Sequence, residues 1–212
     1  MGKVNVIGAG LAGVEAAYFL ANKGHDVHLY EKRPKAMTPA HQTGLFAELV
    51  CSNSLKSNRL DNACGLLKEE MRAMNSLTMD IASLSQVPSG NALSVDRRLF
   101  AELITEKLLQ NPHIFLHEED VATIPKGLSI IATGPLTSEA LIAELKKIIG
   151  VSALSFFDAS APIVIKDSID FSIAYYKSRY EQEDNSYINC PMDKEQYLHF
   201  YEELVKAETV KL

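Results

Sequence analysis

Residues 4–31 read VNVIGAGLAGVEAAYFLANKGHDVHLYE, and this stretch decides the fold. A short apolar run leads into the glycine-rich segment GAGLAG, an Ala- and Leu-rich stretch of helical composition, a second apolar run and Glu31. This order of strand, tight turn, helix, strand and acid is typical of the first unit of a dinucleotide-binding fold. We therefore predict an α/β protein that begins with a Rossmann-like unit.

The glycines of GAGLAG have separate tasks in such a turn. Gly8 permits the sharp turn, Gly10 lets a pyrophosphate approach the backbone, and Gly13 lets the helix lie tight against the strand. The phosphates face the free amides at the helix start, and Glu31 accepts hydrogen bonds from a ribose diol. A glycine-rich turn without a ligand is the alternative interpretation. The predicted cofactor-binding residues here are Gly8, Ala9, Gly10, Leu11, Ala12, Gly13 and Glu31.

A second motif lies near the middle of the chain, where the apolar run Leu128–Ala132 continues into Thr133 and Gly134. It is similar to the late strand of flavoproteins with two dinucleotide-binding domains, which approaches the flavin nucleotide. A strand followed by glycine is common, so the motif gains weight only beside GAGLAG. Together the two motifs favour FAD over NAD and add Thr133 and Gly134 to the predicted cofactor-binding residues.

Composition and charge limit the classes of protein to consider. The chain has 212 residues, 47% of them hydrophobic, with neither an apolar run of membrane-spanning length nor a signal-peptide pattern. Three cysteines without a CxxC motif argue against a disulfide framework and a zinc site. We therefore expect a cytoplasmic protein without a metal.

The formal net charge of −6 is unfavourable for binding nucleic acid, although residues 1–76 are mildly basic. Any RNA contact has to use a local patch, and scattered solvated side chains are the simpler interpretation of its members. The candidates are Lys32, Arg33, Lys35, Lys56 and Arg59.

Residues 34–62 are predicted to be mostly loop, with one short helix across Leu45–Val50, at the edge of the sheet where such folds place active sites. An amphipathic helix follows, with Lys68, Glu69 and Arg72 opposite its apolar face. The residues predicted for that apolar face are Leu66, Leu67, Met71 and Met74.

Local signals define the later elements. Strands are predicted at Ala92–Val95, Ile114–His117 and Leu128–Ala132, and Asp96 is expected to cap a helix over Arg97–Leu109. Thr137 or Ser138 begins a further helix, closed by Gly150, with Leu141, Leu145, Ile148 and Ile149 on one face. Residues 154–190 are read as strands, and Asp193 with Gln196 starts a last helix that buries Tyr197, Phe200, Tyr201 and Leu204.

Two domains follow from this pattern. Residues 1–152 are predicted to form an incomplete FAD-binding domain of the two-dinucleotide-binding-domain flavoprotein type. Residues 153–212 are predicted to begin a smaller α+β insertion or substrate domain, which is truncated.

Several stretches resemble one family closely, the folate- and FAD-dependent tRNA (uracil-5-)-methyltransferases. They are VNVIGAGLAGVEAA, MTPAHQTGLFAELVCSNSL, LLKEEMRAMNS, VPSGNALSVDR, IIATGPLTSEAL, DASAPIVIKDSID and YINCPM. The resemblance covers nearly the whole chain but only about the N-terminal half of the family's usual length. It implies that the segment closing the FAD domain and one of two functional cysteines lie beyond this chain. The missing half is a possible partner as a separate chain, and we expect the 212 residues alone not to methylate tRNA.

The resemblance also implies a reaction, the methylation of uridine C5 in the T-loop of tRNA. The carbon comes from 5,10-methylenetetrahydrofolate, reduced FAD is the reductant, and NADH or NADPH recharges the flavin. A thiolate that adds to uracil C6 makes C5 nucleophilic. Cys51 matches one functional cysteine and is the predicted catalytic residue, with folate or base positioning as its alternative role.

Other candidates have weaker support. His41 is either a proton carrier or an uninvolved histidine, while Cys64 and Cys190 are expected to be structural. Two other functions remain open at this point: an inactive FAD- or ADP-binding remnant, and a generic FAD-dependent oxidoreductase.

Overall fold

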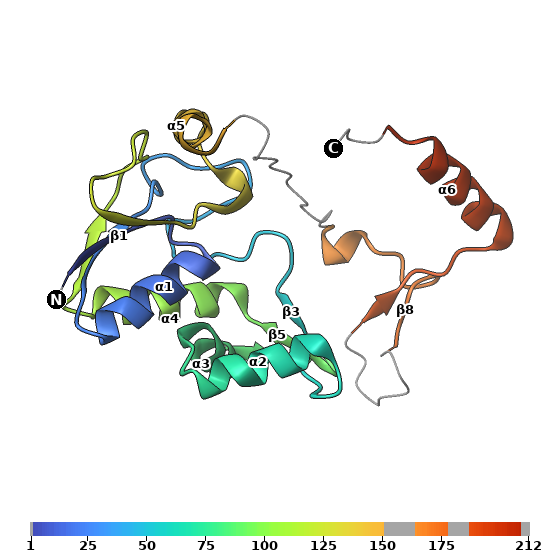
Figure 1. Ribbon diagram of the computed structural model, residues 1–212. Coiled ribbons are helices and arrows are strands. Elements are labelled where there is room, and N and C mark those ends of the chain that lie inside the picture. The colour runs from blue at the N-terminus through green and yellow to red at the C-terminus, as the bar shows by residue number, and fades with distance from the viewer. Residues whose placement is uncertain (1, 151–163, 178–186, 209–212) are drawn as a thin grey trace. The chain divides into compact units, whose positions relative to one another are not determined.

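The computed structural model describes residues 2–150, 164–177 and 187–208 (Figure 1). The chain divides into two compact units, one of Met1–Val87 with Asn91–Ala161 and one of Pro88–Gly90 with Pro162–Leu212. The predicted boundary between residues 152 and 153 and the strands expected within 154–163 and 178–186 lie outside the described residues.

A four-stranded parallel sheet forms the centre of the first unit. Its order is β6 (Ile114–His117), β2 (Asp26–Tyr30), β1 (Lys3–Ile7) and β7 (Leu128–Ile131). Ile7 lies opposite Tyr30 on one side and Ile131 on the other, so neighbouring strands end at the same level. The predicted α/β class and the order strand, helix, strand at the start of the chain are confirmed.

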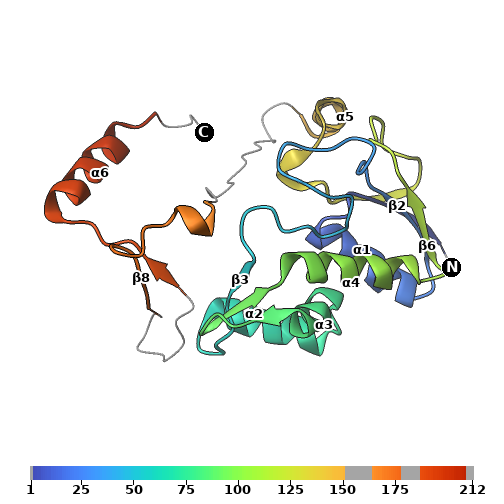
Figure 2. The ribbon, with the colours of Figure 1, turned by 180° about the vertical axis from the view of Figure 1, so that it is seen from behind.

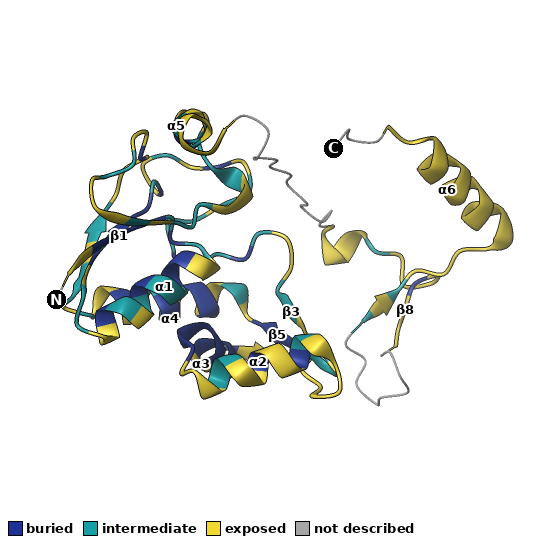
Figure 3. Cartoon of the chain, viewed as in Figure 1, coloured by how far each residue is buried: buried dark blue, intermediate teal, exposed yellow. Residues whose placement is uncertain are grey.

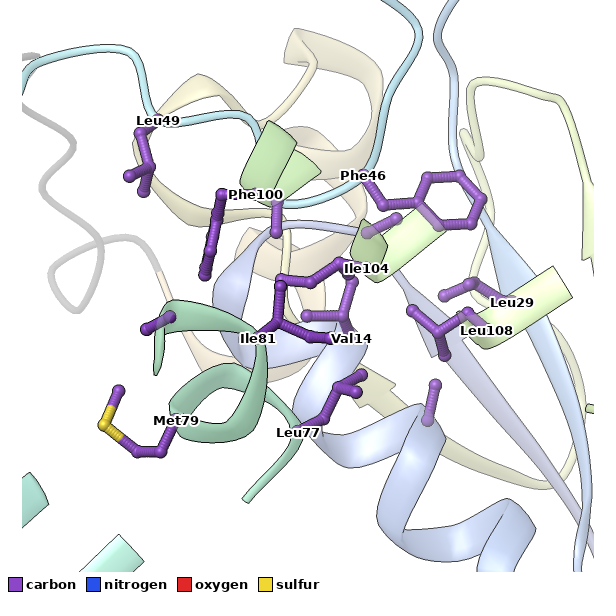
Figure 4. Close-up of a cluster of buried hydrophobic side chains, with 14 of the residues drawn as sticks. Val14, Leu29, Phe46, Leu49, Leu77, Met79, Ile81, Phe100, Ile104 and Leu108 are labelled. Atoms are coloured by element: carbon purple, nitrogen blue, oxygen red, sulfur yellow. The ribbon is translucent and has the colours of Figure 1, made fainter. Parts of the chain in front are cut away.

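The main core lies between one face of this sheet and three helices, α1 (Leu11–Asn22), α3 (Leu77–Leu84) and α4 (Arg97–Leu109) (Figures 1 and 2). Side chains alternate across a strand, and Val6 of β1 with Val27 and Leu29 of β2 belongs to this core. Figure 4 shows Val14 and Leu29 among Leu77, Phe100 and Ile104. Burial of these side chains fixes the sheet that carries the turn at Gly8.

The opposite face of the sheet is partly covered by α5 (Glu139–Ile149). Ile7 and Tyr30 pack there in a second cluster with Val121 and Leu141. Gly150 ends α5 with a φ of 89°, as the sequence predicts for a glycine at a helix end. Ile148 and Ile149, expected on the packed face, are exposed.

A small antiparallel sheet lies beside the core helices, in the order β3 (Ser54–Ser57), β5 (Ala92–Val95) and β4 (Gln86–Val87). The predicted limits of β5, α4 and β6 are confirmed, and the Asp96 side chain accepts hydrogen bonds from the amides of Arg98 and Leu99. The sequence analysis missed β3, β4 and α3, because none of these short elements has a strong periodic pattern of its own.

The predicted helix over Leu45–Val50 is wrong. Ala47 has a left-handed backbone with a φ of 50°, which a right-handed helix does not accept. The Phe46 amide donates to Thr105 Oγ1 at 2.8 Å, and the Ala47 amide donates to the Ala9 carbonyl at 2.8 Å. These contacts replace the i to i−4 bonds that a helix needs.

The helix α2 (Ala63–Ala73) exists as predicted, and Met71 packs against the core, but the predicted burial of Leu66, Leu67 and Met74 is wrong. Lys68 is only 5% exposed, whereas Leu67 is 56% exposed and Leu66 is also exposed. The Lys68 ammonium donates to the carbonyls of Ser57 and Cys64, each at 2.9 Å, so the amine has partners inside the unit.

The second unit contains a two-stranded ribbon of β8 (Tyr175–Tyr176) and β9 (Ile188–Asn189), and the helix α6 (Lys194–Lys206). The predicted capping box of Asp193 and Gln196 is present. The predicted burial of Tyr197, Phe200, Tyr201 and Leu204 is wrong, since all four are exposed (Figure 3). Among the described residues, no helix is both long and apolar enough to cross a membrane.

Candidate dinucleotide-binding site

A pocket of about 550 Å³ opens at the carboxyl ends of the parallel strands. Turns after β1, β2, β6 and β7 form its walls, and the segment 38–52 closes one side. Ligands bind at this edge of open parallel sheets. Of the predicted site residues, it is lined by Gly8, Gly10, Leu11, Ala12, Glu31, Cys51, Thr133 and Gly134.

The two glycines at the ends of the motif are required by packing. Gly8 has a φ of 99°, and a Cβ there would lie 2.6 Å from the Ala132 carbonyl oxygen. A Cβ on Gly13 would lie 1.8 Å from the Gly8 carbonyl oxygen, so the helix touches the turn as the sequence predicts. Gly13 is buried and supports the turn from behind rather than lining the pocket.

Gly10 differs from Gly8 and Gly13, because a Cβ there would meet nothing within 4 Å. It is the N-cap of α1 and provides no side-chain cap, and the first helical bond runs from Val14 N to its carbonyl at 2.9 Å. The preceding amides have no partner within the helix. An open surface beside free amides at a helix start fits a diphosphate.

Glu31 is buried where β2 ends. Its Oε1 accepts from the Arg33 amide at 3.0 Å and the Arg33 Nε at 2.9 Å, while its Oε2 accepts from the Ala9 amide at 3.0 Å. Burial raises the pKa of this carboxyl, but the hydrogen bonds from Arg33 and Ala9 outweigh burial and leave the pKa below its ordinary value. Glu31 is therefore ionised at neutral pH.

Arg33 is a residue whose role the sequence analysis missed. It was considered for an exposed RNA-binding patch, but it is 3% exposed and lies between the carboxylates of Glu31 and Glu48. Its Nη1 is 3.3 Å from Glu48 Oε2. Residues i and i+2 of an extended chain point to the same side, so the spacing of Glu31 and Arg33 was an available signal.

The other residues considered for an RNA-binding patch lie in different parts of the first unit. Lys32 lines the pocket, and its Nζ donates to the Leu136 carbonyl at 3.4 Å. Lys35 Nζ lies 3.6 Å from Glu118 Oε2. Arg59 forms an ion pair with Asp61, and Lys56 is exposed with a φ of 66°.

Thr133 and Gly134 lie at the end of β7, where Gly134 has a φ of 64° and begins the short 3-10 helix η1 (Gly134–Leu136). Thr133 Oγ1 is 2.6 Å from Thr137 Oγ1. The Ser138 Oγ is buried without a hydrogen-bond partner among the described residues, and it provides no cap to α5. This polar turn is the second wall of the pocket.

Cys51 is exposed and lines the pocket beside Val50 and Ser52. His41 lines it as well, with Nδ1 2.6 Å from Thr38 Oγ1. Burial, and then the charge of Arg33, lower the pKa of His41 below its ordinary value, so its imidazole is neutral at pH 7. Cys64 is half-buried and Cys190, in the second unit, is exposed.

The fold and the pocket define a Rossmann-like dinucleotide-binding domain of the flavoprotein type. Residues 3–212 match the family described as Glucose inhibited division protein A, and the chain belongs to this family.

Curated relatives are close in sequence, and several are named methylenetetrahydrofolate–tRNA-(uracil-5-)-methyltransferase TrmFO. The protein from Lactobacillus delbrueckii subsp. bulgaricus is 55% identical over 211 residues, which is 99% of this chain and 48% of that protein. The protein from Desulfitobacterium hafniense is 54% identical over 213 residues, which is 100% of this chain and 49% of that protein. The chain thus spans about half the length of these relatives, and the predicted family resemblance is confirmed.

Among solved structures, Aquifex aeolicus GidA is similar over 59% of this chain and 21% of its own, with a TM-score of 0.47 and 16% identity.

Proposed function

We propose that the whole protein methylates C5 of a uridine in the T-loop of tRNA, with 5,10-methylenetetrahydrofolate as carbon donor. FAD is the proposed resident cofactor, and NADH or NADPH the proposed source of reducing equivalents. Identity of 54–56% to relatives that are named for this reaction supports the proposal. The proposal concerns the whole protein, since the chain spans about half of each relative.

The observation that carries the proposal is the shared pocket. Its walls place Cys51 in the same cavity as Gly10, Glu31 and Gly134. A thiol beside a dinucleotide-binding turn is the combination that a flavin-dependent alkylation of a base needs, because nucleophile and reductant act on one substrate.

The residues proposed to hold FAD are those of the two turns. Amides of residues 10–13 face the diphosphate, and Thr133 with Gly134 form the opposite side. Glu31 Oε2 accepts from Ala9 N and retains capacity for a ribose hydroxyl. When bound, the reduced flavin supplies the hydride that brings the one-carbon unit to the methyl level.

Cys51 is the proposed nucleophile. Its thiolate adds to uracil C6, so that the electron pair moves to C5, which then attacks the one-carbon unit. Loss of the C5 proton and departure of the thiolate restore the ring. The neutral His41 imidazole in the same pocket is a candidate to accept this proton.

The proposed organisation follows the chemistry. Residues 1–152 hold the cofactor, residues 153–212 begin a substrate domain, and the part of the relatives' length that this chain does not span supplies the remaining surface. The tRNA is the proposed macromolecular partner, and the cytoplasm is the proposed location.

The experiment compares Cys51→Ala with Cys190→Ala, a matched removal of an exposed thiol in the second unit. Each variant is made in the whole protein and assayed for 5-methyluridine in unmodified tRNA. We expect Cys51→Ala to abolish methyl transfer with near-normal flavin content, and Cys190→Ala to retain both. Unchanged turnover of Cys51→Ala would remove Cys51 from the chemistry.

A single-turnover assay with the 212-residue chain, methylenetetrahydrofolate, reduced nicotinamide and tRNA separates the alternatives. We expect flavin binding without 5-methyluridine. Product formed above the protein-free background would mean that Cys51 suffices without the second functional cysteine that is expected beyond this chain.

A further inference from the structure

A closed circuit of contacts surrounds the peptide unit of Ala9, in the middle of the glycine-rich turn. Its amide donates to Glu31 Oε2 at 3.0 Å, and its carbonyl accepts from the Ala47 amide at 2.8 Å. Glu31 is joined through Arg33 to Glu48, which follows Ala47 in the chain. We call these five residues the Ala9 circuit.

The far side of the circuit organises the segment that leads to Cys51. Glu48 Oε1 accepts from the Gln42 amide at 2.9 Å, and Oε2 accepts from the Thr43 amide at 3.0 Å and the Thr43 hydroxyl at 2.7 Å. Arg33 Nη1 also lies 3.5 Å from the Thr43 carbonyl. One carboxylate and one guanidinium therefore hold most of the turn at 42–48.

The charges of the circuit depend on one another. Removing Arg33 leaves the carboxylates of Glu31 and Glu48 without their cation in a largely buried place, which is strongly unfavourable. A change at the turn that moves Glu31 is therefore transmitted to the Glu48 carboxylate through the buried Arg33 side chain, whereas the Ala9 carbonyl contacts the Ala47 backbone directly.

We propose that Arg33 is a positioning residue that couples occupation of the glycine-rich turn to the order of the Cys51 segment, residues 42–52. A dinucleotide at the turn fixes Ala9 and Glu31. Arg33 then holds Glu48, and Glu48 holds the amides of Gln42 and Thr43. This inference rests on the proposed dinucleotide site and adds that the cofactor prepares the segment carrying the nucleophile.

The test is amide-resolved hydrogen exchange by NMR on the 212-residue chain, with and without saturating ADP. Four amides report on the circuit: Ala9 on the turn side, and Gln42, Thr43 and Ala47 on the segment side. In the wild type, ADP should slow exchange on both sides, by about fivefold or more on the segment side.

In Arg33→Gln, ADP should still protect Ala9 but should no longer protect Gln42 and Thr43, and Arg33→Lys should restore part of the effect. Arg98→Gln is the control, since Arg98 pairs with Glu102 on the surface of α4 at 2.8 Å. Equal ADP protection of Gln42 and Thr43 in wild type and Arg33→Gln would overturn the proposal.

Two further measurements separate failure of the coupling from misfolding of Arg33→Gln and from failure of ADP to bind. If Arg33→Gln does not fold, Glu48→Gln tests the same link while leaving the Arg33–Glu31 pair in place. If ADP does not bind the wild type, the dinucleotide site is wrong, yet the coupling is still tested without ligand. Arg33→Gln should then accelerate exchange at Ala9 and at Gln42 together, and acceleration on one side alone contradicts the coupling.

Discussion

At the scale of single residues, one glycine motif contains positions with opposite constraints. Gly13 has no room for a side chain, because a Cβ would lie 1.8 Å from the Gly8 carbonyl oxygen. Gly10 has open space beside it and faces the pocket. The close contact at Gly13 follows from the sequence, because the spacing of the three glycines encodes the turn geometry itself, and the approach of a pyrophosphate at Gly10 stays a prediction.

Gly13→Ala should therefore destabilise the first unit by about 3 kcal/mol or more, since the backbone of the turn has to move. Urea denaturation measures the change in the free energy of unfolding. Gly2→Ala is the matched control, because a Cβ there lies 3.8 Å from its nearest neighbour, His25 Nδ1. A Gly13→Ala variant as stable as Gly2→Ala would contradict the close helix–turn contact.

The pocket also predicts a dependence of stability on pH. Folding lowers the pKa of His41 from 6.5 and those of Glu31 and Glu48 from 4.5, so the unfolded chain binds more protons during acidification. Stability is fully present above pH 6.5. We expect it to fall first below pH 6.5 as His41 is protonated on unfolding, and again below pH 4.5.

Unfolding free energy measured between pH 8 and 3 checks this sign. Glu48→Gln should flatten the decline below pH 4.5 and leave the decline near pH 6 in place. A wild-type protein that gains stability on acidification through this range would contradict the ionised state of the two carboxylates.

At the scale of elements, the structure shows where local signals suffice. The helix α4 and its Asp96 cap match the prediction because the capping hydrogen bonds lie within one turn. The orientation of α2 does not follow from its own pattern. Its lysine is buried because carbonyls of Ser57 and Cys64 are available, and the Ser57 carbonyl belongs to another element, β3.

Lys68→Met should consequently cost about 2 kcal/mol of stability, since the half-buried Ser57 and Cys64 carbonyls lose a charged donor. Leu67→Gln should change the unfolding free energy by less than about 0.5 kcal/mol, because Leu67 is largely exposed. The orientation predicted from the helical periodicity, with Leu67 buried and Lys68 exposed, would instead make Leu67→Gln the more destabilising substitution. Thermal or urea denaturation of the two variants therefore distinguishes the observed orientation from the predicted one.

At the scale of the whole molecule, the sequence predicted the parallel sheet, and most of the predicted site residues line the pocket, because glycine turns and strand ends are local features. It did not predict the left-handed Ala47 in the segment 38–52 or the burial of Arg33 before it, because these depend on contacts with Ala9 and Glu31. Neither could it place Ser138 or Glu48 in the pocket, since their positions follow from packing of distant elements.

The edge strand β7 predicts association of the isolated chain. Leu128 is 67% exposed and Ile130 is 36% exposed, and alternation along a strand places both on the same face. We expect sedimentation velocity to show concentration-dependent association, which Leu128→Gln reduces while Leu67→Gln does not. A strictly monomeric wild-type chain at high concentration would contradict this expectation.

The central claim is that the turn at Gly8–Gly13 holds a dinucleotide, and calorimetric titration of FAD and ADP into wild type and Gly10→Val tests it most directly. A Cβ at Gly10 would meet nothing within 4 Å, and a side chain there would enter the space assigned to the diphosphate. We predict that Gly10→Val lowers the unfolding free energy by no more than about 1 kcal/mol, the cost of a poor N-cap, and weakens binding at least about 100-fold, while Gly2→Val binds normally. Equal affinity of Gly10→Val and wild type would contradict the account.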